Sequence, residues 1–133
     1  MKKMNPVVHF ELPAFDRDRM ADFYSEAFGW KAHKLGPEMG YYVTVDTTET
    51  DENQMVKNPG AINGGLYPRN EGMGAVYPSL VIAVDDINDS VKQIVGAGGK
   101  LLSEPSDIPG VGKFLSFEDT EGNRLSILQP LMK

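Results

Sequence analysis

Two stretches of this chain, Val7–Trp30 (VVHFELPAFDRDRMADFYSEAFGW) and Tyr77–Lys100 (YPSLVIAVDDINDSVKQIVGAGGK), carry the same pattern. In each stretch a short apolar run leads to an aspartate and then to an amphipathic segment that ends at glycine. Adding 70 to the residue number converts Asp16 into Asp86, which holds the equivalent place in the second copy. An internal repeat of this kind predicts an architecture built from two similar units.

A helix is predicted after each aspartate, because Asp is a good N-cap and apolar residues then recur at helical spacing. Gly29 is placed to end the first helix in a left-handed conformation, and the glycines at 96, 98 and 99 end the second. The apolar positions are Met20, Phe23, Tyr24, Ala27 and Phe28 in the first helix and Ile87, Val91, Ile94 and Val95 in the second.

Three short segments with strand character follow each predicted helix, and turn residues separate them. These segments are 31–35, 41–46 and 62–67 in the first half and 100–103, 113–117 and 124–129 in the second. Each half therefore reads strand–helix–strand–strand–strand. We predict an α+β fold with two tandem βαβββ modules, at residues 5–69 and 76–130, within one domain over residues 1–133.

Alternation along the strands predicts which side chains face the helices. The large residues that should pack beneath them are Phe10 and Leu12, then Leu80, Ile82 and Val84, and finally Leu125 and Ile127. The opposite faces then carry His9, Glu11, Ser79, Val81, Ser126 and Leu128. Joined side by side and curved, these two free faces would line a central cup.

Composition excludes several classes of function. The 133 residues contain no cysteine, so disulfides, thiolate metal sites and a cysteine nucleophile are excluded. A net charge of −6 without a cluster of basic residues argues against nucleic acid as a partner. The longest aliphatic run, Leu80–Val84, is too short to span a membrane, and no apolar segment follows the N-terminal lysines. We therefore expect a cytoplasmic protein with neither a membrane nor a nucleic-acid partner.

The order and spacing of several motifs resemble the vicinal oxygen chelate superfamily of glyoxalase I, extradiol dioxygenases and bleomycin-resistance proteins. The motifs are 8–12 (VHFEL), 23–30 (FYSEAFGW), 62–66 (INGGL), 84–87 (VDDI), 98–100 (GGK), 108–112 (IPGVG) and 119–123 (DTEGN). They are similar in particular to a bacterial branch of predicted enzymes related to lactoylglutathione lyase. The resemblance implies the glyoxalase/dihydroxybiphenyl dioxygenase-like fold, a curved mixed sheet around a central cup, and it is compatible with a homodimer.

The resemblance also implies where a divalent metal would bind, since the family takes its ligands from the first and last strand of each half. Those positions are His9, Gly64, Ser79 and Ser126 here. Of these only His9 is a competent ligand, so the family metal is predicted to be absent. The alternative metal donors are Glu11, on the same strand face as His9, and Glu38 or Asp46 from a neighbouring segment.

The predicted ligand-binding residues of the cup are His9, Glu11, Tyr42, Gly64, Ser79, Val81, Ser126 and Leu128. His9 and Glu11 are the candidate catalytic residues, His9 as a general base or a polar contact. The alternative for His9 is a satisfied, partly buried histidine. The polar segment Thr47–Lys57 is inserted in the first half only, as a lid or as a plain surface insertion.

Three functions are compatible with these residues. The first is binding or transformation of a small organic molecule in the cup without a metal, because small residues at the ligand positions leave room for it. The second is a metal-dependent lyase, isomerase or dioxygenase that uses His9 and Glu11. The third is drug binding of the bleomycin-resistance type. The sequence leaves open whether the chain is an enzyme.

Overall fold

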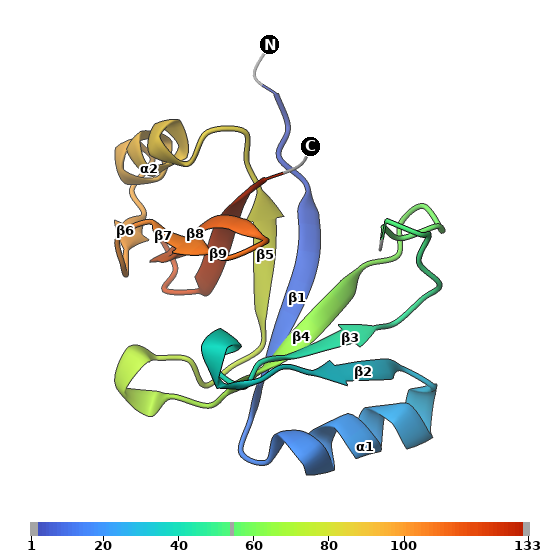
Figure 1. Cartoon of the computed structure of the whole chain (residues 1–133). Coiled ribbons are helices and arrows are strands. Elements are labelled where there is room, and N and C mark those ends of the chain that lie inside the picture. The colour runs from blue at the N-terminus through green and yellow to red at the C-terminus, as the bar shows by residue number, and fades with distance from the viewer. Residues whose placement is uncertain (1–2, 54, 132–133) are drawn as a thin grey trace. The chain divides into compact units, whose positions relative to one another are not determined.

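The computed structural model describes residues 3–53 and 55–131 (Figure 1). The chain forms two compact units. The N-terminal unit is His9–Pro78, and the C-terminal unit consists of the described parts of Met1–Val8 and Ser79–Lys133. No helix in the described ranges is long and apolar enough to cross a membrane.

The N-terminal unit contains one helix and four strands. In chain order these are β1 (Val7–Ala14), α1 (Arg17–Phe28), β2 (Lys31–Lys34), β3 (Val43–Asp46) and β4 (Asn63–Pro68). Short 3₁₀ helices at Pro37–Met39 and Glu71–Met73 were not predicted. The strands lie in the order β2-β3-β4-β1, with β1 parallel to β4 and the other pairs antiparallel.

Local sequence explains both ends of α1. The Asp16 side chain accepts a hydrogen bond from the Arg19 backbone N–H at 3.0 Å, which satisfies one of the free N–H groups of the first turn. Gly29 ends the helix at φ 73°, a left-handed conformation that favours glycine. The predicted cap, helix and glycine stop are therefore confirmed.

One face of this sheet packs beneath α1. The core consists of Ala21, Val43, Val45 and Leu66, against which Phe10, Leu12, Met20, Trp30 and Ala32 pack. Phe10 and Leu12 thus face the helix, as the alternation of β1 predicts. His9 and Glu11 lie on the other face of the same strand.

The C-terminal unit repeats this arrangement with one additional strand. Its elements are β5 (Ser79–Ala83), α2 (Ile87–Gly96), β6 (Lys100–Leu101), β7 (Ser106–Ile108), β8 (Gly112–Glu118) and β9 (Arg124–Pro130). The strand order is β5-β9-β8-β6, with β7 also paired to β8 and β5 parallel to β9. β7 was not predicted, because three residues are too few to show alternation.

The second helix also begins and ends close to its predicted bounds. The Asp86 side chain accepts from the backbone N–H groups of Asn88 and Asp89. Ala97 caps the C-terminus at φ −91°, and Gly98 takes the left-handed conformation at φ 101°. The repeat partner of Gly29 is Gly99, so the left-handed residue lies one position earlier in the second copy.

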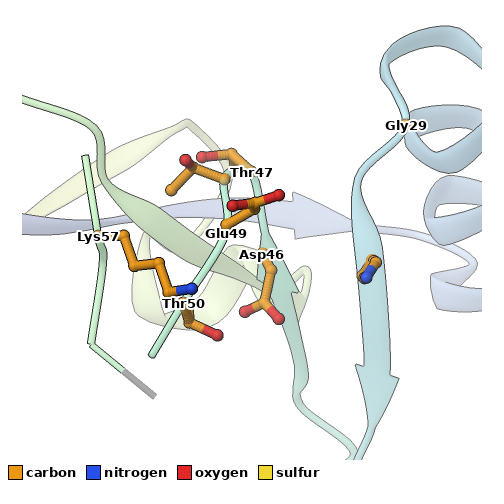
Figure 2. Close-up of a pocket in the computed structure, with 8 residues that line it drawn as sticks. Gly29, Asp46, Thr47, Glu49, Thr50 and Lys57 are labelled. Atoms are coloured by element: carbon orange, nitrogen blue, oxygen red, sulfur yellow. The ribbon is translucent and has the colours of Figure 1, made fainter. Parts of the chain in front are cut away.

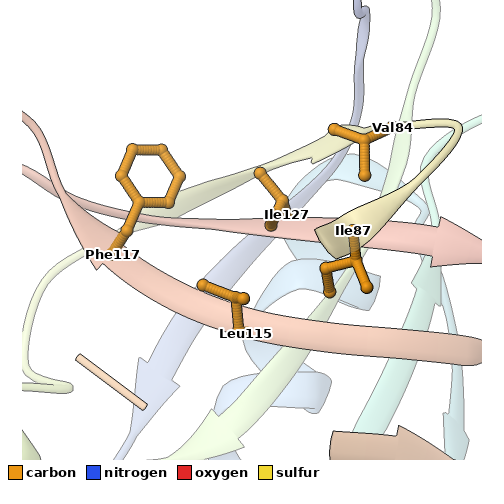
Figure 3. Close-up of a cluster of buried hydrophobic side chains, with 5 residues drawn as sticks. All are labelled: Val84, Ile87, Leu115, Phe117 and Ile127. Carbon is orange, nitrogen blue, oxygen red and sulfur yellow. The ribbon is translucent and has the colours of Figure 1, made fainter. Parts of the chain in front are cut away.

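Five buried side chains form the core of the C-terminal unit between α2 and its sheet (Figure 3). They are Val84, Ile87, Leu115, Phe117 and Ile127, and Ile82 and Leu125 pack against them. The inward assignments of Ile82, Val84, Leu125 and Ile127 are confirmed. Leu80 is 41% exposed and takes no part in this cluster, so its assignment was wrong. It lies at the start of β5, whereas the chain enters α2 from the other end of that strand.

The α+β class is confirmed, and the N-terminal half has the predicted β-α-β-β-β order. The C-terminal half departs from that order by the additional strand β7, between β6 and β8. The inserted segment is a small hairpin: Thr50 pairs with Val56, and the Lys57 N–H donates to the Glu49 carbonyl at 3.1 Å. The central cup and the single-domain organisation stay predictions.

Candidate functional site

A hydroxyl group connects the two candidate catalytic residues. Tyr42 Oη lies 2.9 Å from His9 Nε2 and donates a hydrogen bond of 2.9 Å to Glu11 Oε2. Tyr42 precedes Val43, whose side chain is buried in the α1 core, so the tyrosine points to the opposite face of the sheet. Alternation on β1 brings His9 and Glu11 to this same face. We call these three residues the His9–Tyr42–Glu11 relay.

Gly65 makes room for this relay. It lies opposite Glu11 in the parallel β1–β4 pairing. A Cβ atom at position 65 would overlap the hydroxyl group and ring of Tyr42. The tyrosine therefore occupies the space that a side chain from β4 would need on this face.

Gly64, which the sequence placed in the cup, faces the other way. A Cβ atom there would collide with the Phe10 ring, on the face that α1 covers. Glu11 pairs with Gly65, and its repeat mate Val81 pairs with Ser126, so Gly65 is the counterpart of Ser126. The assignment of Gly64 was wrong by one position, because β4 has too little side-chain character to set its register from sequence.

Burial sets the protonation of the relay. It lowers the pKa of His9 below the ordinary value of 6.5, because the charged imidazolium loses hydration. Burial also raises the pKa of Tyr42, and the nearby Glu11 carboxylate raises it further. At neutral pH the imidazole is therefore uncharged and the tyrosine keeps its proton.

The lowered pKa of His9 predicts a pH dependence of folding. In the unfolded chain His9 titrates near 6.5, so below that pH the unfolded state binds more protons than the folded state. The free energy of unfolding should fall as the pH drops from 6.5 towards the lower folded-state pKa. Urea denaturation across this range should show the slope in the wild type and in His33→Gln, but not in His9→Gln. An unchanged slope in His9→Gln would contradict the assignment.

The C-terminal unit carries a second polar group, on the sheet face opposite α2. Ser126 is fully buried, and its Oγ lies 3.0 Å from Ser116 Oγ. Arg124 Nη2 donates to Ser116 Oγ at 3.2 Å, and Ser79 Oγ donates to the Arg124 carbonyl at 2.9 Å. Arg124 Nε is buried and has no hydrogen-bond partner within the described ranges. Val81, which pairs with Ser126, is also buried.

Ser116 was missed at the level of sequence, although a signal for it was present. Leu115 and Phe117 are core residues of β8, so the residue between them must lie on the opposite face. Leu128, on β9, is partly buried and pairs with Phe114 of β8.

The residues at the expected metal positions do not fit the divalent ion of the vicinal oxygen chelate family. His9 Nε2 and Glu11 Oε2 are both engaged by Tyr42, and the Ser79 and Ser126 hydroxyls bind groups of the protein. Asp46, an alternative donor, pairs with His33 at 3.2 Å. In residues 3–53 and 55–131 no three His, Asp or Glu side chains gather at one point where they could hold a metal ion.

A pocket of about 480 Å³ lies elsewhere in the N-terminal unit, beside the inserted hairpin. Figure 2 shows charged and hydroxyl side chains around it. The lining residues are Gly29, Lys31, Asp46, Thr47, Thr48, Glu49, Thr50 and Lys57. None of the predicted cup residues lines this pocket, so it is a separate candidate for ligand binding.

Comparison with known proteins identifies the family. The sequence pattern of the Glyoxalase/Bleomycin resistance protein/Dioxygenase superfamily matches residues 7–127. The chain belongs to this superfamily. The resemblance inferred from the motifs is thereby confirmed.

Similar proteins include a "Glyoxylase-like domain-containing protein" of Didymella fabae, 34% identical over 120 residues that cover 88% of each chain. Anthracycline biosynthesis protein DnrV of Streptomyces peucetius is 28% identical over 123 residues, which are 89% of this chain and 44% of DnrV. Methylmalonyl-CoA epimerase, solved in complex with methylmalonyl-CoA and NH4+, superposes with a TM-score of 0.70 at 16% identity, over 98% of this chain and 97% of the epimerase. At that identity the likeness shows the fold, as the sequence predicted.

Proposed function

We propose that this member of the superfamily binds a small organic molecule at the sheet face that carries the His9–Tyr42–Glu11 relay, without the divalent metal of the family. The observation that carries the proposal is the position of the Tyr42 hydroxyl, between His9 Nε2 and Glu11 Oε2 and over Gly65.

Coordination chemistry supports a site without metal. An imidazole nitrogen binds a metal ion through a lone pair, and the Nε2 position of His9 is engaged in a hydrogen bond with Tyr42. A metal at Nε2 would have to displace the tyrosine from both partners. Gly65 contributes no donor from β4, so this unit would supply at most two protein ligands.

The relay is suited to bind a ligand through hydrogen bonds and to exchange a proton with it. It combines an uncharged imidazole, a protonated hydroxyl and a carboxylate on one face of the sheet. Groups of this kind orient polar atoms of a ligand, and an uncharged imidazole can accept a proton from it. DnrV is an anthracycline biosynthesis protein, and the epimerase was solved with methylmalonyl-CoA. Both concern small organic molecules, which supports the same class of ligand here.

Metal titration tests the proposal. Purified protein should contain no stoichiometric metal by elemental analysis, and titration with Ni, Zn, Mn and Fe(II) should show no binding that depends on His9. Tyr42→Phe removes the competing hydroxyl and serves as the matched variant. Stoichiometric binding to the wild type that His9→Ala abolishes would establish the metal-dependent alternative instead.

A ligand screen by thermal shift tests the location of the site. A compound that stabilises the wild type should lose its effect in His9→Ala and keep it in Lys57→Ala. The second variant alters the pocket beside the inserted hairpin and leaves the relay intact. The opposite pattern would move the ligand site to that pocket.

A further inference from the structure

We infer that the relay holds His9 as the Nε2–H tautomer, so that Nδ1 is the lone-pair acceptor and the ligand is a hydrogen-bond donor with a weakly acidic O–H or N–H group. The ligand class rests on the proposed function, whereas the tautomer rests on geometry alone.

The first step is a count of protons. Tyr42 has a single hydroxyl proton and lies 2.9 Å from a hydrogen-bonding atom on each side. An ionised carboxylate can only accept, so the tyrosine proton goes to Glu11 Oε2. The contact with His9 then needs a second proton, and only Nε2–H can supply it. The raised pKa of Tyr42 agrees with a hydroxyl that stays protonated.

The second step concerns the orientation of the imidazole ring. The His9 and Tyr42 rings lie nearly in one plane, with an interplanar angle of 20° and their centroids 6.4 Å apart, so Nε2 points along the plane at the tyrosine hydroxyl. The hydrogen bond at Nε2 therefore sets the orientation of the ring. Across residues 3–53 and 55–131, Nδ1 makes no hydrogen bond to another protein group. An uncharged imidazole with its proton on Nε2 presents a lone pair at Nδ1.

The third step is the chemistry that fits this lone pair. A ligand carbonyl or carboxylate oxygen would place its own lone pair against Nδ1, which is unfavourable. A ligand O–H or N–H would donate to it. If the O–H is acidic enough, its proton moves to Nδ1 and the electron pair stays on the ligand oxygen. The imidazolium formed is stabilised through Tyr42 by the Glu11 carboxylate, as an orienting acid stabilises a catalytic histidine.

Nitrogen NMR tests the tautomer without any ligand. The chain has two histidines, so ¹⁵N-labelled His33→Gln leaves His9 as the single imidazole signal. At pH 8 the spectrum should show a protonated Nε2 and an unprotonated Nδ1. In Tyr42→Phe the preference should weaken towards a mixture of tautomers. A protonated Nδ1 in the parent, or no change in Tyr42→Phe, would overturn the assignment.

A matched pair of probes tests the ligand class. 4-Nitrophenol has a weakly acidic hydroxyl, and its ionisation is visible in the absorbance spectrum, whereas 4-nitroanisole carries a methyl ether in its place. The phenol should shift the Nδ1 resonance of His9 and the ether should not. Equal shifts with both probes would overturn the donor requirement. If His9 is the Nε2–H tautomer but the protein binds neither probe, the proposed ligand class is wrong and the tautomer assignment remains valid.

Discussion

Gly65→Ala is expected to break the His9–Tyr42–Glu11 relay while leaving the chain folded. A methyl group at this position overlaps the hydroxyl and ring of Tyr42, so the tyrosine must leave its place between the two catalytic candidates. Overpacking of this kind costs about 1–3 kcal/mol of unfolding free energy. We also expect ligand-induced thermal stabilisation to be lost, because the relay residues no longer meet.

Two other glycines of the N-terminal unit supply the controls. Gly64→Ala pushes on Phe10 across the opposite face, so it should destabilise the α1 core without moving Tyr42. Gly72→Ala meets only an ordinary contact with Asn70 and should change little. Urea denaturation measures the cost in each variant, and the His9 nitrogen spectrum reports whether the relay survives.

A double-mutant cycle isolates the cause. In a Tyr42→Ala background the added methyl group has nothing to overlap, so Gly65→Ala should cost much less there than in the wild type. If the two substitutions are simply additive, the glycine does not act through the tyrosine.

Leu115→Ala is expected to produce the largest loss of stability. Leu115 is 1% exposed at the centre of the C-terminal core, where Ile87, Phe117 and Ile127 surround it. Truncation of a buried leucine removes about 2–5 kcal/mol through lost burial and the cavity left behind. The midpoint of urea denaturation should therefore fall strongly.

Val95→Ala is the matched control for this substitution. Val95 lies on α2 and is 54% exposed, so its truncation removes little buried surface. Alanine is also the better helix former, and the expected change is within about 0.5 kcal/mol. Equal losses from both variants would show that Leu115 does not anchor this core.

The repeat, the caps and the glycine stops were predicted well because they depend on neighbouring residues. Asp16 and Asp86 cap helices within three residues of themselves, and Gly29 ends a helix through its own backbone freedom. Alternation correctly predicted which side chains face the helices in β1, in the C-terminal half of β5 and in β9. These features are local or periodic, and a single chain displays them directly.

The sheet face of residues in segments without a hydrophobic pattern was predicted less well. β4 reads as Asn-Gly-Gly-Leu-Tyr-Pro, and two consecutive glycines give no side chains from which to judge its faces. Its register is set by pairing with β1, so Gly65 and not Gly64 shares the face of the relay. The inserted hairpin and its pocket likewise depend on contacts between distant segments.

By itself, the sequence determined the superfamily, the strand–helix repeat and the presence of His9, Glu11 and Tyr42 among the candidates. Only the tertiary structure decided that Tyr42 connects the other two, because the residues lie 33 and 31 positions apart and meet through strand pairing. A hydrogen bond depends on distance and direction, which sequence spacing does not specify for separate strands. That contact joins the three candidate residues in one hydrogen-bonded group, on which the proposed function rests.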